Sequence, residues 1–195
     1  MRTLVDLDGV AAGWGHGYDT LAEQFGLLAE GGMLYHERTT WDLRQGLTER
    51  GLDITRQIME YDGFYRNLPV IDGAQDAIER LQRTGHDVWF VSTPYLSNPS
   101  CANDKLAWVE EHFGPRLMAK TILTMDKTVV IGDVLIDDRP EISGVQAPTW
   151  KHLCFGEYGY SATTQSERVK TWYDVETTIM LLQWERDLTN TKVVG

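Results

Sequence analysis

Two aspartates separated by one residue follow the first apolar run of the chain, in Asp6-Leu7-Asp8-Gly9-Val10. At a strand end the two carboxylates converge once the chain leaves the pleat, and Gly9 frees the backbone to turn. One carboxylate can attack phosphorus and form an acyl phosphate. The other can protonate the leaving oxygen and then activate water. An acidic turn that merely closes a strand is the alternative, but this pentapeptide after an N-terminal strand favours a functional pair of carboxylates, Asp6 and Asp8.

Adjacent acids follow a later apolar segment, in Gly132-Asp133-Val134-Leu135-Ile136-Asp137-Asp138-Arg139-Pro140. Asp137 and Asp138 can complete an oxygen-ligand site for Mg²⁺. The cation would offset the repulsion between Asp6 and a phosphate. An acidic loop without function is again the alternative. The presence of the first acidic motif in the same chain makes that alternative less favoured.

Hydroxyl groups and a lysine supply candidate phosphate contacts. Ser92 and Thr93 end a second strong strand, and Lys105 lies near the start of a predicted helix. A hydroxyl and nearby N–H groups can hold a phosphate oxygen, and a lysine can neutralise developing negative charge. Taken alone, Ser-Thr before Pro94 is a turn signal, and most lysines are solvated.

Apolar runs and helical patterns alternate along the chain, which predicts a doubly wound α/β parallel sheet. The ends of its strands face one crevice, so all four motifs would share one site. The predicted strands are Thr3–Asp8, Asp87–Thr93, Thr121–Thr124, Thr128–Ile131, Val134–Asp138 and Trp150–Phe155, and the clearest helices are Ala74–Arg83 and Asn103–Phe113.

Residues 14–69 break the alternation, because they show helical patterns, many aromatic residues and no convincing strand. We expect this segment to form a small helical cap over the carboxyl edge of the sheet. Residues 1–13 and 70–195 would form the core, with a helical tail from Ser166 to Asp187. Trp14 follows the first motif closely enough to contact a ligand.

The net charge of −11 argues against binding of nucleic-acid polymers or anionic membranes. No apolar run reaches the roughly 18 residues that span a bilayer, and no signal-peptide pattern begins the sequence, so a cytoplasmic protein is the default expectation. Cys101 and Cys154 form no CxxC pair and are expected to be free thiols.

The motifs resemble those of the haloacid dehalogenase-like superfamily, and specifically the 5′(3′)-deoxyribonucleotidases. The likeness covers Thr3–Val10 and roughly Phe64–Phe155. It is carried by Trp108-Val109-Glu110, Phe113-Gly114-Pro115, Ile122-Leu123-Thr124, Asp126-Lys127-Thr128-Val129-Val130, Leu135-Ile136-Asp137-Asp138-Arg139-Pro140 and Pro148-Thr149-Trp150-Lys151-His152. The resemblance implies a HAD-like Rossmannoid fold with an inserted cap, and a homodimer is what the family suggests.

The resemblance also implies roles for individual residues. Asp6 would be nucleophile and metal ligand, and Asp8 the general acid and base that gives its carbonyl to the metal. Asp138 matches the carboxylate ligand, with Asp137 beside it. The phosphate would be held by Ser92, Thr93 and Lys105, with Lys127 as a second lysine near the site, and the base would meet Trp14, Phe64 and Trp41. In the cap, Trp41 stands alone where human-type relatives carry a Phe-Trp pair.

The leading hypothesis is therefore a Mg²⁺-dependent phosphatase that acts on 5′-deoxyribonucleoside monophosphates, with 3′-monophosphates left open. A phosphatase for another small phosphomonoester is the second hypothesis. A non-catalytic nucleotide-binding module is the third, and the intact motifs argue against it.

Overall fold

Six parallel strands form one sheet in the computed structural model, which describes the backbone of residues 1–193 and the side chains of residues 1–189. The strand order is β3-β2-β1-β4-β5-β6, so successive connections run outward in two directions from β1. This confirms the predicted parallel α/β sheet. The strands are β1 Arg2–Val5, β2 Asp87–Ser92, β3 Thr121–Leu123, β4 Val134–Asp137, β5 Lys151–Phe155 and β6 Glu167–Val169.

The two faces of the sheet are covered differently. Alternate side chains of a strand point to opposite faces, and Val5 joins the main core cluster while Leu4 packs with Trp150 in a smaller one. Besides residues of segment 14–69, the main cluster contains apolar residues of the helices α3 Ala74–Arg83, α4 Cys101–Phe113 and α6 Trp172–Val193. The short helix α5 Pro115–Met118 follows α4. Among residues 1–193, no helix is both long enough and apolar enough to cross a membrane.

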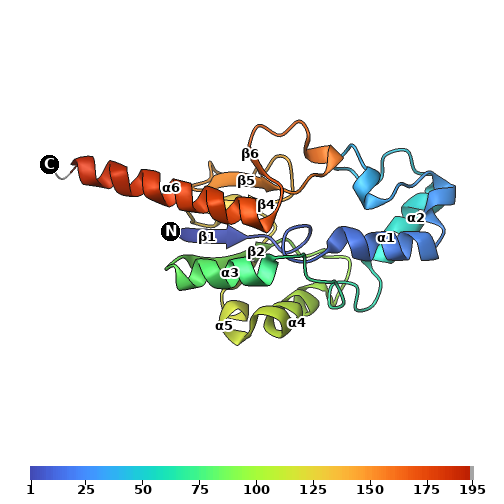
Figure 1. Cartoon of the computed structure of the whole chain (residues 1–195). Helices are drawn as coiled ribbons and strands as arrows, with labels where there is room; N and C mark the ends of the chain where they lie inside the picture. The colour runs from blue at the N-terminus through green and yellow to red at the C-terminus, as the bar shows by residue number, and fades with distance from the viewer. Residues whose placement is uncertain (194–195) are drawn as a thin grey trace.

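Residues 14–69 carry two helices, α1 Trp14–Gln24 and α2 Glu49–Met59, and two short 3₁₀ helices, η1 Leu27–Glu30 and η2 Tyr35–Glu37. Figure 1 shows this segment beyond the end of the sheet toward which β1 points. Its two ends lie side by side, because the Gly13 amide donates to the Pro69 carbonyl at 2.7 Å and the Ile71 amide donates to the Ala11 carbonyl at 2.8 Å. The chain therefore leaves and re-enters the sheet region at one place.

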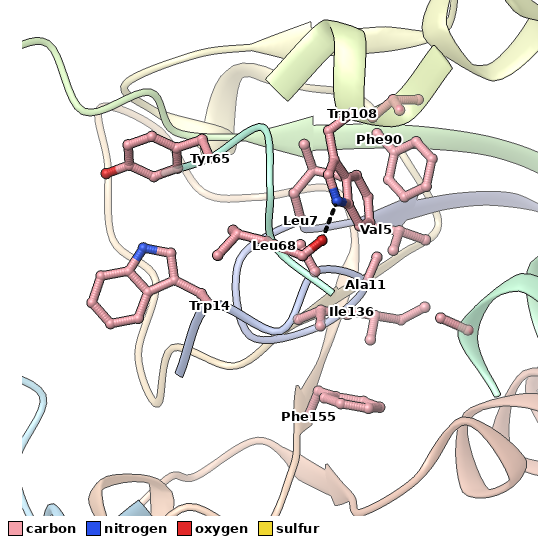
Figure 2. Packing of buried hydrophobic residues seen from close by; sticks show 14 of the residues in the cluster. Val5, Leu7, Ala11, Trp14, Tyr65, Leu68, Phe90, Trp108, Ile136 and Phe155 are labelled. Atoms are coloured by element: carbon pink, nitrogen blue, oxygen red, sulfur yellow. Dashed lines mark hydrogen bonds between the residues drawn. The ribbon is translucent and has the colours of Figure 1, made fainter. Parts of the chain in front are cut away.

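Two buried tryptophans bind the backbone at that place. The Trp108 indole nitrogen donates to the Leu68 carbonyl at 2.7 Å (Figure 2), and the Trp172 indole nitrogen donates to the Val10 carbonyl at 3.0 Å. Both side chains are almost fully buried. Each indole supplies apolar contact area and also pairs a carbonyl that would otherwise be unsatisfied.

Two sequence predictions were wrong in detail. The segment Thr128–Ile131 is not a strand, because the Asp126 carboxylate accepts from the Thr128 amide at 2.8 Å and caps the 3₁₀ helix η3 Lys127–Val129. A local side-chain bond of this kind competes with strand pairing. The expected helix from Ser166 starts later, since Glu167–Val169 pair with β5 and α6 begins at Trp172.

We predict that Trp108→Phe lowers the free energy of unfolding by about 1–3 kcal/mol, because it leaves the buried Leu68 carbonyl without its donor. Urea denaturation followed by circular dichroism measures the change. Trp184→Phe is the matched control, because Trp184 is 61% exposed and should change stability by no more than about 0.5 kcal/mol. Equal stabilities for the two variants would contradict the role assigned to the indole bond.

Candidate active site

The loop after β1 places two aspartates at the carboxyl end of the sheet. The Leu7 carbonyl accepts from the amides of residues 10, 11 and 12, and this tight turn places Gly9 at a φ of +74°. A side chain at position 9 would be strained, and its β-carbon would overlap Asp138 Oδ2. Asp6 is 7% exposed, and its Oδ1 accepts from the Leu7 amide at 2.8 Å. The glycine therefore allows the first acidic motif to approach the second.

Lys127 joins the two acidic motifs. Its ammonium nitrogen lies 2.8 Å from Asp6 Oδ1 and 2.5 Å from Asp137 Oδ2, and its side chain is 8% exposed. Burial would lower the pKa of this ammonium, but attraction to Asp137 and Asp6 outweighs burial and raises the pKa. Lys127 is thus a fixed positive charge between two buried carboxylates.

Lys105 is the buried positive partner of Asp8, as Lys127 is of Asp6 and Asp137. Its ammonium nitrogen donates to Asp8 Oδ2 at 2.7 Å, to Ser92 Oγ at 2.9 Å and to the Thr93 carbonyl at 3.0 Å. The Lys105 side chain is 2% exposed and lies 5.3 Å from the centre of the Tyr65 ring. The other Asp8 oxygen, Oδ1, is buried without a hydrogen-bond partner among the described residues. One oxygen of Asp8 is thereby held, and the other is left for a ligand.

The carboxylates form a cluster that fits a hard cation. Asp6, Asp137 and Asp138 each offer an oxygen, and these atoms lie within 4.8 Å of one another. All three side chains are buried. Burial, followed by the neighbouring acids, raises the pKa of Asp138 well above its ordinary value, and burial also raises the pKa of Asp8 and of Asp137. Oxygen donors alone suit Mg²⁺ rather than a softer metal.

Charge also favours a divalent ion. Among the described residues, the site holds four carboxylates, those of Asp6, Asp8, Asp137 and Asp138, and two ammonium groups paired with them, those of Lys105 and Lys127. When all are ionised, an excess of two negative charges remains in a buried place. Such an excess is costly unless a cation offsets it. The oxygen donors of Asp6, Asp137 and Asp138 and the excess of negative charge therefore both fit a hard divalent cation at this site.

The predicted aromatic residues divide into two groups. Trp14 and Phe64 lie together, with ring centres 5.8 Å apart and planes at 88°, and both are nearly buried. Trp41 is 40% exposed and packs on Tyr160 at 5.2 Å instead. Figure 2 shows Trp14 and Tyr65 beside each other near the end of the core. Thr93 is itself exposed, and its carbonyl, not its hydroxyl, holds Lys105.

Three tyrosines near the site were not predicted. The Tyr35 and Tyr160 hydroxyls donate to Asp138 Oδ2, and the Tyr158 hydroxyl donates to the Gly9 carbonyl at 3.2 Å. The sequence offers only the weak signal of two tyrosines in Tyr158-Gly159-Tyr160, after the last predicted strand.

Comparisons with known proteins agree on one family. The family model described as 5′ nucleotidase, deoxy (pyrimidine), cytosolic type C protein matches residues 1–184. The mitochondrial 5′(3′)-deoxyribonucleotidase of Mus musculus is 33% identical over 187 residues, which cover 89% of this chain and 82% of the relative. The cytosolic-type 5′(3′)-deoxyribonucleotidase of Homo sapiens is 34% identical over 168 residues, covering 80% and 79%.

Solved structures share the fold at much lower identity. A haloacid dehalogenase-like family hydrolase from Xanthomonas campestris superposes with a TM-score of 0.54 at 12% identity, covering 95% of this chain and 97% of the other. This likeness shows the fold alone, and it confirms the HAD-like α/β architecture.

We predict that Lys127→Met lowers the free energy of unfolding by about 3–5 kcal/mol at neutral pH, because it leaves Asp6 and Asp137 buried without their counter-charge. Urea denaturation in the presence of a chelator measures this. Lys120→Met is the control, because Lys120 pairs with Asp87 at 2.7 Å but is 41% exposed, and such surface pairs contribute about 0–1 kcal/mol. A loss no larger than that of the control would show that Lys127 does not balance the acidic cluster.

Proposed function

The chain belongs to the family described as 5′ nucleotidase, deoxy (pyrimidine), cytosolic type C, a family of phosphomonoester hydrolases, and from this membership we propose that it is a Mg²⁺-dependent phosphatase of deoxyribonucleoside monophosphates. The observation that carries the proposal is the pairing of Asp6 with Lys127 and of Asp8 with Lys105 within one buried site. Two carboxylates with separate partners can take separate roles.

Asp6 is the proposed nucleophile. Lys127 and the Leu7 amide both hold its Oδ1, and no described residue gives a hydrogen bond to Oδ2. Oδ2 attacks phosphorus, an Asp6 O–P bond forms, and the bond from phosphorus to the nucleoside oxygen breaks. Water then attacks phosphorus, the Asp6 O–P bond breaks, and inorganic phosphate is released.

Asp8 is the proposed proton carrier for both steps. Burial raises the pKa of its carboxyl group, which favours the protonated form that the first step needs. Asp8 gives its proton to the leaving nucleoside oxygen and later takes one from the attacking water. Lys105, which contacts both Asp8 and Ser92, orients this group and adds positive charge near the phosphate.

The phosphate and the cation have separate proposed contacts. Ser92, Thr93 and Lys105 form one wall of the phosphate site, and Lys127 lies on the nucleophile side. Mg²⁺ would be held by carboxylate oxygens of Asp6, Asp137 and Asp138, together with the Asp8 carbonyl. When bound, it supplies charge that offsets the repulsion between Asp6 and the phosphate.

Residues 14–69 are the proposed cap, and residues 1–13 and 70–195 the proposed core. The paired entry and exit of this segment and its place beyond the sheet support the division. A nucleoside that extends from the phosphate site would then meet Trp14 and Phe64, with Trp41 farther out. A homodimer remains a prediction that rests on the family resemblance.

The function is tested by a screen of phosphomonoesters, with phosphate release as the measurement. We expect hydrolysis of deoxyribonucleoside monophosphates with Mg²⁺, none in excess chelator, and recovery on adding Mg²⁺ back. Asp6→Asn should lower kcat on the order of 10³-fold or more, whereas the exposed Asp76→Asn on α3 should not change it.

Each other result of the screen has a clear meaning. Full activity in chelator would contradict the metal site, and retention of activity by Asp6→Asn would contradict the nucleophile. Hydrolysis of only sugar phosphates would favour the second hypothesis, and tight nucleotide binding without any turnover would favour a binding module.

We also predict a preference for deoxyribonucleotides over ribonucleotides. A wall of aromatic rings such as Trp14 and Phe64 offers few partners to a 2′-hydroxyl, and burying that group unpaired costs about 1–3 kcal/mol, or roughly 5- to 150-fold in kcat/KM. The measurement compares dUMP with UMP and dGMP with GMP under one set of conditions. Phe64→Ala should shrink the difference but leave hydrolysis of p-nitrophenyl phosphate, which has no sugar, nearly unchanged. Equal values for both pairs in the wild type would remove the deoxyribonucleotide preference and leave the phosphatase chemistry standing.

A further inference from the structure

One carboxylate of the acidic cluster, that of Asp138, accepts hydrogen bonds from two tyrosines that are far apart in the sequence. Asp138 Oδ2 accepts from the Tyr35 hydroxyl at 2.9 Å and from the Tyr160 hydroxyl at 2.7 Å, and the two hydroxyl oxygens are 2.6 Å apart. Tyr35 lies in η2 of segment 14–69, and Tyr160 lies in the 3₁₀ helix η4 Gly159–Ser161, after β5. The two tyrosines are 5% and 3% exposed, so water competes little for these bonds.

Both tyrosine hydrogen bonds go to the same oxygen of the Asp138 carboxylate, Oδ2. Among the described residues, no hydrogen bond reaches Asp138 Oδ1. Oδ2 also lies close to the Gly9 backbone, where even a β-carbon would overlap it. The carboxylate is therefore fixed at one oxygen, while the other remains available to a cation shared with Asp6 and Asp137.

The tyrosine rings are themselves fixed by packing. The Arg38 guanidinium lies 5.1 Å from the centre of the Tyr35 ring and 5.4 Å from that of Tyr160. Tyr158 stacks on Tyr160 at 5.1 Å with an interplanar angle of 9°, and Trp14 packs on Tyr35 at 5.3 Å. Rings held on several sides can direct their hydroxyls with little loss of side-chain entropy.

Tyr35 links segment 14–69 to the carboxylate cluster. Among the described residues, it is the one member of this segment that forms a hydrogen bond to a carboxylate of Asp6, Asp8, Asp137 or Asp138. Its own amide donates to Asp19 Oδ1 at 2.5 Å, which ties η2 to α1. A change in the orientation of the Asp138 side chain would therefore alter its hydrogen bond to Tyr35, and through it the position of η2 in segment 14–69.

We propose that Tyr35 and Tyr160 are positioning residues that hold Asp138 in the orientation required for a divalent cation, and that Tyr35 thereby couples cation binding to the ordering of segment 14–69. The inference rests on the proposed function, because it takes Asp138 as a ligand of the cation. Hydrogen bonds to a metal ligand orient it and raise metal affinity. Coupling is reciprocal, so a cation that needs the fixed carboxylate must also stabilise the Tyr35 bond.

The first test measures cation affinity directly, without turnover. Mn²⁺, which also takes oxygen ligands, is titrated into the metal-free protein and its Kd is measured by calorimetry. We expect Tyr35→Phe and Tyr160→Phe each to weaken binding by roughly 10-fold or more. Tyr18→Phe is the matched control. Tyr18 is equally buried in the same ring cluster, 5.0 Å from Trp14, but its hydroxyl does not contact Asp138, so its Kd should equal that of the wild type.

The second test measures the coupling by hydrogen–deuterium exchange of residues 32–38. In the wild type, Mg²⁺ should slow exchange of the amides of Tyr35, Glu37 and Arg38, at most by the factor by which Tyr35→Phe weakens Mg²⁺ binding. In Tyr35→Phe, Mg²⁺ should leave these amides unchanged. If Mg²⁺ slowed exchange in Tyr35→Phe by the same factor as in the wild type, or had no effect on these amides in the wild type, the coupling through Tyr35 would be overturned.

Failure of the inference can be told from failure of the proposed metal site. If the wild type binds Mn²⁺, Asp138→Asn abolishes binding, and both tyrosine variants bind as tightly as Tyr18→Phe, only the inference is overturned. If the wild type binds no Mn²⁺, or if Asp138→Asn binds it normally, the proposed metal site falls and the inference falls with it.

Discussion

The Lys127 ammonium lies between Asp6 and Asp137, in a place where burial works against any uncompensated charge. Three carboxylates whose oxygens lie within 4.8 Å repel one another strongly in a medium less polar than water. Lys127 reduces that repulsion without neutralising the site, because one ammonium faces two acids and Asp138 stands outside the pair. Another lysine here would weaken the attraction for a divalent cation, and without Lys127 the buried acids would lack a counter-charge. The balance of charge is therefore what allows the site both to fold and to bind.

The parallel sheet brings these charges together with little help from side chains. Val5 is in register with Ile136, and the Asp6 amide donates to the Ile136 carbonyl at 2.9 Å. Because β1 and β4 are neighbours that point the same way, the residues that follow them emerge side by side. The strand order also turns around at β1, which is where ligands bind in open sheets of this kind. Backbone pairing thus makes the two acidic motifs neighbours although they are far apart in sequence, and Gly9 allows their close approach.

The sequence could predict what depends on local pattern. Apolar runs that end in acids marked β1 and β4, and helical spacing marked α3 to the residue. It could not predict what depends on partners chosen in space. Nothing local distinguishes Lys127, which pairs with Asp6, from Lys105, which pairs with Asp8. The short strand β6 exists because β5 offers it an edge, and the tyrosines that grip Asp138 lie in 3₁₀ turns that have no periodicity to read.

The contacts of segment 14–69 explain why a hydroxyl matters at position 35. Trp14, Tyr18 and Phe64 pack through ring faces and edges. Such contacts prefer stacked or edge-on arrangements but tolerate small shifts of the rings, so they favour a packed segment without setting its exact orientation. A hydrogen bond has a preferred length and angle, and Tyr35 directs one at Asp138. A phenylalanine would keep most of the packing and lose the alignment. In this protein, packing of aromatic rings places segment 14–69 against the site. The hydrogen bond from Tyr35 to Asp138 then aligns the segment with the carboxylates that would hold the cation.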